Sequence, residues 1–309
     1  MNITLNNINN IKFSGSRFSI VNRTSNPSHL DKNSLQLTTL PCDTLEVNQD
    51  FKISNKSQQL LSKFKKFDIS SYNSLSIIDK MMLKKTSMDV VQAAEDNVNV
   101  GIKVKEYLDR IHGEDNYVFV SVGTSPAGIG RTLEFMGVET KYLPISGLKY
   151  YCEDETYKQF EPQFPKYKEF LDEQGLSREE IMSSGKKYIF YDYAMTGSSL
   201  SVFSRMIREN FGLDMENVAF GTINYDCYIA TLKNTKLQKN VVAFVDKYMA
   251  DEEIAQYCGV AHLPIWEINK IDECKNFESE KAKRFNFLVI DLLNRKKLLK
   301  DNPKNKNSL

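Results

Sequence analysis

The residues best suited to chemistry lie in the stretch KKYIFYDYAMTGSSLSVF, which begins at residue 186. An apolar, strand-like run ends there in one acid, Asp192. Four small residues follow it before the pattern becomes helical: Thr196, Gly197, Ser198 and Ser199. Small residues let a backbone approach a ligand, hydroxyls donate hydrogen bonds, and a helix start adds partial positive charge. The stretch therefore has the components of a phosphate-binding loop with a carboxylate beside it.

A second turn of the same kind lies upstream, in VSVGTSPAGIGR. Gly123, Thr124 and Ser125 stand between a short apolar run and a helical pattern, and Arg131 on that helix could reach a diphosphate. Glycine and serine also make tight turns and cap helices without binding anything. Two such turns together with an acid favour a binding site.

Alternating apolar runs and helical patterns predict the elements that must position these turns. Strands are expected at residues 116–123, 140–147, 186–193, 216–225 and 240–249, and helices at 87–111, 127–137, 163–173, 177–184, 199–210 and 278–300. Such alternation is typical of an α/β fold with a single mainly parallel sheet and helices on both faces. We expect strands 116–123 and 186–193 near the middle of the sheet, with both turns at one edge, where ligands of parallel sheets bind.

Composition separates the chain into three parts. Residues 1–75 are rich in Asn and Ser and lack clear periodicity, which predicts a largely disordered segment with one short helix between residues 51 and 67. Residues 85–300 are expected to form the α/β domain, and 301–309 a polar basic tail.

Charge and cysteine usage exclude several function classes. The net charge of +1 gives no overall field for nucleic acid or an anionic membrane, so neither is an expected partner, although a homodimer is compatible with the sequence. Five scattered cysteines and three histidines suit reduced thiols better than disulfides or a zinc site. With no apolar span and no secretory h-region, the expected location is cytoplasmic.

The stretch YIFYDYAMTGSSL resembles the phosphoribosyl-diphosphate signature of type I phosphoribosyltransferases, which is an apolar strand, two acids, three residues and Thr-Gly-x-Thr/Ser. Asp192 matches the second acid, and Thr196, Gly197 and Ser199 match the phosphate loop. The resemblance implies that this loop, with Ser198, holds a ribose 5′-phosphate. It also implies that Asp192 addresses the ribose hydroxyls and a Mg²⁺ ion bound with the diphosphate.

The order of elements from 116 to 249 also resembles this family. Residues 123–127 take the position of its pyrophosphate loop, and the insert 148–185 stands where the family carries a mobile loop. The implied ligand is phosphoribosyl diphosphate or a nucleotide, and the implied activity is transfer of the phosphoribosyl group with loss of diphosphate.

One departure from the family pattern keeps other interpretations open. The first acid of the pair is Tyr191 here. Either another acid, such as Asp226 or Asp246, takes its place, or the domain senses a nucleotide or sugar phosphate without catalysis. Asp192 and Thr196 also have the D-x-x-x-T spacing of haloacid-dehalogenase-like phosphatases, although that motif usually follows the first strand. A sugar-phosphate-binding domain of the isomerase type has the same kind of cradle.

Overall fold

The computed structural model describes residues 55–85, 88–148, 154–194, 198–209, 212, 218–224, 241–243, 268 and 279–300. All of them belong to one compact unit, Gln49–Leu309. The expected basic tail, 301–309, and the first part of the expected N-terminal segment, residues 1–54, lie outside the described residues.

The sheet has five described strands, all parallel to their neighbours, in the order β2-β1-β3-β4-β5. Their bounds are β1 Tyr117–Val122, β2 Thr140–Leu143, β3 Lys187–Ala194, β4 Val218–Asn224 and β5 Val241–Ala243. The α/β class is therefore confirmed, with β3 in the middle of the sheet and β1 next to it. β2 is shorter than expected because Pro144 follows it and has no N–H to extend the ladder.

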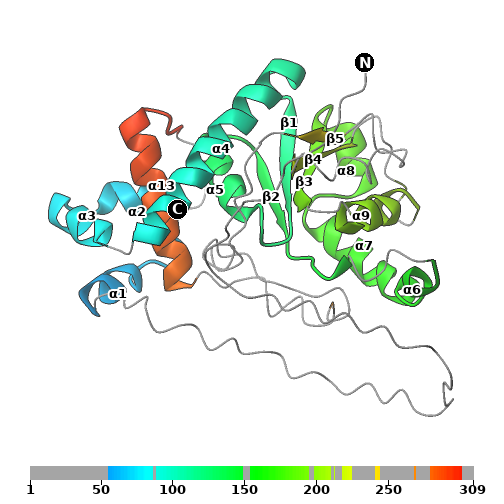
Figure 1. The fold of residues 1–309 in the computed structure, drawn as a ribbon, viewed down its shortest axis with the longest axis horizontal. Coiled ribbons are helices and arrows are strands. Elements are labelled where there is room, and N and C mark those ends of the chain that lie inside the picture. The colour runs from blue at the N-terminus through cyan, green and yellow to red at the C-terminus, as the bar shows by residue number, and fades with distance from the viewer. Residues whose placement is uncertain are drawn as a thin grey trace, which may run out of the picture. The chain divides into compact units, whose positions relative to one another are not determined.

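Side chains of the central strands alternate between two helical layers. Phe119 and Tyr191 point to the layer of α4, α5 and α13, whereas Val120 and Phe190 point to that of α7, α8 and α9. β1 and β3 thus bury both faces, as a covered parallel sheet requires. Figure 1 shows the two layers on opposite sides of the strands. The helices are α4 Met88–His112, α5 Ala127–Phe135, α6 Asp154–Lys158, α7 Phe164–Glu173, α8 Arg178–Ser183, α9 Ser198–Glu209 and α13 Glu280–Lys296.

The insert between β2 and β3 supplies part of the sheet's cover. Its described residues contain α6, a 3-10 turn at Glu161–Gln163, α7 and α8. Phe164, Phe170 and Ile181 from these helices are buried beside Val120 and Phe190 of the sheet. This part of the insert is therefore a structural layer, which differs from the mobile loop that the family resemblance implies.

Residues 55–75 correct the expected limit of the disordered N-terminal segment. They form α1 Asn55–Leu61 and α2 Ile69–Ser74, followed by α3 Ile77–Lys84. Leu61, Phe67 and Tyr72 are fully or almost fully buried in the core that contains α13. The Asn- and Ser-rich average over 75 residues concealed these few apolar residues, which have a tertiary surface to pack against.

Buried polar contacts attach these N-terminal helices to α13. The Tyr72 hydroxyl donates to Asp291 at 2.9 Å, and Lys84 forms an ion pair with the same carboxylate at 3.0 Å. The guanidinium of Arg284, 1% exposed, donates to the carbonyls of Leu83 and Lys85. Burial, reinforced by the Asp291 hydrogen bond and charge, raises the pKa of Tyr72 to about 12.

Candidate functional site at the carboxyl edge of β1 and β3

The two predicted turns follow neighbouring parallel strands. The strand register pairs Ser121 with Tyr191, so the next row places Val122 level with Asp192. Adjacent strands are about 4.8 Å apart. The carboxyl ends of β1 and β3 therefore lie side by side at the same edge, and the expected position of these two strands near the middle of the sheet is confirmed.

Chain direction makes this edge a topological switch point. From β1 the chain crosses through α5, on one face of the sheet, to β2 at one side of the strand order. From β3 it crosses through α9, on the opposite face, to β4 at the other side. The carboxyl ends of strands at such a reversal leave a crevice between diverging connections, where open α/β sheets bind ligands.

The turn after β1 is built tightly against the end of β2. Gly123 has φ +77°, and its N–H donates to the Leu143 carbonyl at 2.7 Å. A Cβ on Gly123 would lie 3.0 Å from the Ile145 carbonyl oxygen. Glycine is thus required here by the fold itself, whether or not a ligand approaches. Thr124 and Ser125 are half-buried at this turn.

The start of α5 gives a stronger indication of a ligand. Its N-cap is Pro126, which makes no side-chain cap hydrogen bond, and the first turn of the helix is buried. The N–H of Ala127 bonds to Thr124 and that of Gly130 to Pro126, but among the described residues the N–H groups of Gly128 and Ile129 have no partner outside the helix. Buried helix starts normally have their orphan N–H groups satisfied, and an anion satisfies them well.

The turn after β3 is described only in part. Asp192 is half-buried on β3 and pairs in register with Thr222 of β4. Thr196 and Gly197 lie outside the described residues. Ser198 opens α9, and Ser199 behind it is half-buried. Asp192 and α9 are thus placed at the proposed edge, while the geometry of the loop between them is not described.

Tyr191 does not replace the missing acid. It is fully buried and packs against Phe119, with ring centroids 5.1 Å apart. Because successive side chains on a strand point to opposite faces, Tyr191 lies in the α4–α5–α13 core while Asp192 faces the other layer. Asp226 and Asp246, the other candidate acids, lie outside the described residues.

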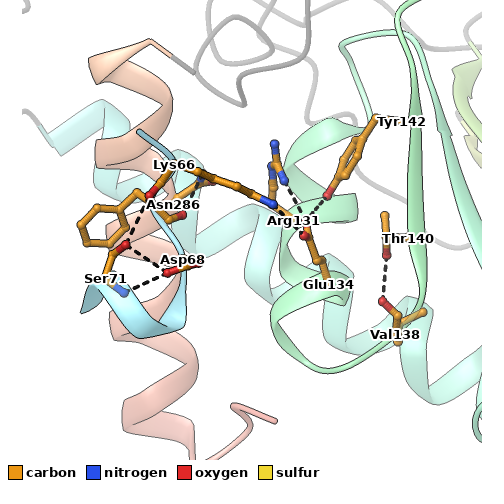
Figure 2. A network of polar contacts seen from close by, with 10 residues as sticks. Lys66, Asp68, Ser71, Arg131, Glu134, Val138, Thr140, Tyr142 and Asn286 are labelled. Carbon is orange, nitrogen blue, oxygen red and sulfur yellow. Dashed lines mark hydrogen bonds and ion pairs between the residues drawn. The ribbon is translucent and has the colours of Figure 1, made fainter. Parts of the chain in front are cut away.

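Arg131 has protein partners that sequence reasoning missed. Its guanidinium forms an ion pair with Glu134 at 2.7 Å and stacks over Tyr142 at 4.5 Å (Figure 2). Tyr142 donates to the same carboxylate at 2.9 Å, and Lys66 lies 3.5 Å from it. Burial acts to raise the pKa of Glu134, but the positive charges of Arg131 and Lys66 and the hydrogen bonds from Arg131 and Tyr142 together outweigh it, so the pKa lies below its ordinary value. These contacts hold the Arg131 side chain against Glu134 of its own helix and Tyr142 of the edge strand β2.

A hollow lies at the opposite, amino edge of the strands. It measures about 420 Å³ and is lined by charged side chains, including Lys105, Asp109, Glu139 and Lys186. These charges pair with one another: Lys105 lies 2.5 Å from Asp109 and Lys186 lies 2.9 Å from Glu139. These four charges are therefore paired. No group of three or more metal-binding side chains occurs among the described residues.

No protein-family model, curated protein or solved structure matches the chain. Within the part of the chain that is described, no helix has the length and apolar character needed to cross a bilayer. Function must therefore be inferred from the geometry and chemistry of the site itself.

Proposed function

We propose that the chain binds a phosphorylated ribose compound, phosphoribosyl diphosphate or a nucleotide, at the carboxyl edge between β1 and β3. The observation that carries this proposal is that the carboxyl ends of β1 and β3 lie next to each other at the switch point, and that β1 leads into a buried helix start without a side-chain cap. The proposed fold type is that of the type I phosphoribosyltransferases.

Each part of the edge has a defined role in the proposal. Thr196, Gly197, Ser198 and Ser199 hold the 5′-phosphate, and Asp192 hydrogen-bonds the ribose hydroxyls. Gly123, Thr124 and Ser125, with the N–H groups of Gly128 and Ile129, face the diphosphate. We leave Arg131 out of this set because it is already engaged with Glu134 and Tyr142.

A Mg²⁺ ion fits this arrangement as a ligand-bound ion rather than a resident one. Mg²⁺ usually keeps several waters and is held by one or two carboxylates together with substrate phosphates. Asp192 supplies one carboxylate at the edge. The ion would neutralise charge on a departing diphosphate, while the turn amides position that group.

A sensor that binds the same ligand without transferring the phosphoribosyl group is the second candidate. The observation that favours it is Tyr191, whose burial against Phe119 leaves β3 with Asp192 as the one described acid at the edge. The phosphatase alternative gains no support, because β1 and β2 precede β3 and Asp192 does not follow the first strand.

Isothermal titration calorimetry with phosphoribosyl diphosphate, ribose 5-phosphate and mononucleotides, each with Mg²⁺, tests the proposal. We expect binding of at least one of them, and the absence of binding to all would overturn it. Losing a hydrogen bond to a charged phosphate costs about 1.5–3 kcal/mol, so Thr196→Ala should weaken binding about ten- to hundredfold. Thr140→Ala, a matched change at the amino edge, should leave affinity unchanged.

Release of diphosphate distinguishes a transferase from a sensor that only binds the ligand. A transferase should release it when a suitable base is supplied, and Asp192→Asn should remove that release while 5′-phosphate binding persists. Binding without release for every base tested would assign the chain to the sensor class.

A further inference from the structure

The short helix α3 directs large apolar side chains into solvent. Ile77, Ile78 and Met81 have exposed fractions of 79%, 76% and 62%. They are the three most exposed large apolar residues among those described. Single exposed apolar residues are ordinary, but three on neighbouring positions of one helix form a patch.

On α3, the exposed apolar patch lies on a different face from Asp79 and from the buried Leu83. At about 100° per residue, Ile77, Ile78 and Met81 span an arc of about 100°, and Lys84 falls just beside it. Lys85 follows as the exposed C-cap of the helix. Leu83, fully buried, and Asp79 lie about 100° or more from that arc. The apolar face is thus bordered by lysines and turned away from the core.

α3 is held in place by contacts at its two ends. Ser76 and Asp79 form a capping box at its start, with the Ser76 hydroxyl 2.7 Å from the Asp79 carboxylate. Arg284 binds the carbonyls of Leu83 and Lys85 at its end. The three exposed side chains are therefore presented by a helix that the fold has already fixed, which lowers the entropic cost of using them.

The segment that carries this patch has an excess of positive charge. Residues 55–85 contain seven lysines and two aspartates, a net charge of +5, whereas the whole chain has +1 and the remainder therefore −4. Lys63, Lys65 and Lys85 are exposed, and no ion pair is seen for them among the described residues. The helix α3 also contacts α1, so the segment is one connected structure.

We propose that α3 docks on an anionic lipid surface, with Ile77, Ile78 and Met81 inserted at the headgroup boundary and the surrounding lysines on acidic headgroups. An apolar face with a lysine border is the chemistry of an interfacial helix, and each lysine near an anionic bilayer adds attraction. No membrane partner was expected from the sequence because the overall charge is only +1. That total hides the local excess of positive charge in residues 55–85.

The same residues suit a protein partner less well. Protein interfaces are depleted in Lys and favour aromatic residues and Arg, and a stable one buries about 800 Å² on each side. The patch has three aliphatic or thioether side chains, and all the basic residues of 55–85 are lysines. A few inserted side chains are enough for reversible attachment to lipid when charge assists.

Co-sedimentation of the full chain with vesicles tests this proposal. We expect binding to phosphatidylcholine vesicles that contain phosphatidylserine, little binding to phosphatidylcholine alone, and weaker binding as salt rises. The triple variant Ile77→Ser, Ile78→Ser, Met81→Ser should reduce the bound fraction at least tenfold. The variant Lys63→Gln, Lys65→Gln, Lys85→Gln, which spares the ion pairs of Lys66 and Lys84, should lose the preference for acidic lipid.

Matched controls come from other exposed apolar residues. Ile111→Ser and Met182→Ser, at 49% and 45% exposure on α4 and α8, should bind vesicles as the wild type does. Circular dichroism confirms that each variant is folded. Wild type that stays in the supernatant, or a triple variant that binds equally, overturns the proposal. So does a wild-type dimer in light scattering that the triple variant converts to a monomer, because the patch would then join two copies.

Discussion

Replacing Gly123 with alanine tests whether the turn after β1 belongs to a binding site. The residue has φ +77°, and an added Cβ would lie 3.0 Å from the Ile145 carbonyl oxygen. Gly185 is a matched control: it has φ +68°, precedes β3 at the opposite edge of the sheet, and has nothing within 4 Å of an added Cβ. Both substitutions therefore place alanine at a positive φ, but only Gly123→Ala also brings a Cβ against the Ile145 carbonyl oxygen.

The two free energies can be estimated from these contacts. A left-handed conformation costs a non-glycine residue about 1–2 kcal/mol, partly offset by about 0.4–1 kcal/mol because alanine restricts the unfolded chain. Gly185→Ala should thus lower the free energy of unfolding by roughly 1 kcal/mol. Gly123→Ala must also move the turn away from Ile145 and strain the Gly123–Leu143 hydrogen bond, which adds about 1 kcal/mol. Its total should be about 2 kcal/mol.

Urea unfolding and calorimetry of both variants give the comparison. If the displaced turn loses one hydrogen bond to a charged phosphate, Gly123→Ala should weaken ligand binding about ten- to hundredfold. Gly185→Ala should bind as wild type does. Equal affinity in the two folded variants, for a ligand that wild type binds, would refute the assignment of the β1–α5 turn to the site.

Three further predictions concern individual side chains. Tyr191→Asp should not create a second site acid but should destabilise the fold by about 3–5 kcal/mol, the cost of an uncompensated buried charge, whereas Tyr191→Phe should stay within about 1 kcal/mol in urea unfolding. Asp192→Ala should weaken ribose 5-phosphate about tenfold or more and leave inorganic phosphate unaffected in calorimetry; equal losses for both would contradict a ribose contact. Folded Tyr72 has a pKa of about 12 against 10.0 unfolded, so the unfolded state loses its proton first and stability should fall from pH 10 to 12. Tyr72→Phe should make that fall shallower in alkaline unfolding curves, and an unchanged slope would argue against the Asp291 contact.

The sequence predicted the sheet and most helices because both depend on local periodicity. The run Tyr117–Val122 is continuously apolar apart from Ser121, as a strand covered on two faces must be, and the glycine after it marks the turn. Helix α13 was expected at 278–300 and occupies Glu280–Lys296, between a Ser279 cap and a left-handed Lys297. The edge shared by the two turns followed from parallel strand pairing alone.

Other features depend on tertiary partners that no local pattern reveals. Arg131 has the spacing of a solvent-facing or ligand-facing helix residue, and only the neighbouring strand shows that it stacks on Tyr142 beside Glu134. A short helix was expected between residues 51 and 67, where α1 lies, but α2 was obscured by a polar average, since Phe67 and Tyr72 find their core on α13, more than two hundred residues later. Strand alternation around Asp192 did carry a usable signal, because it places Tyr191 on the opposite, buried face.

Amide hydrogen exchange of the full chain, with and without phosphoribosyl diphosphate and Mg²⁺, tests the central claim most directly. Binding between β1 and β3 predicts new protection in the peptides that cover residues 123–130 and 195–200, with none at the amino edge around 113–117 and 184–187. Protection confined to the amino edge, where the charged hollow lies, or protection at neither turn when the ligand saturates the protein, would contradict it.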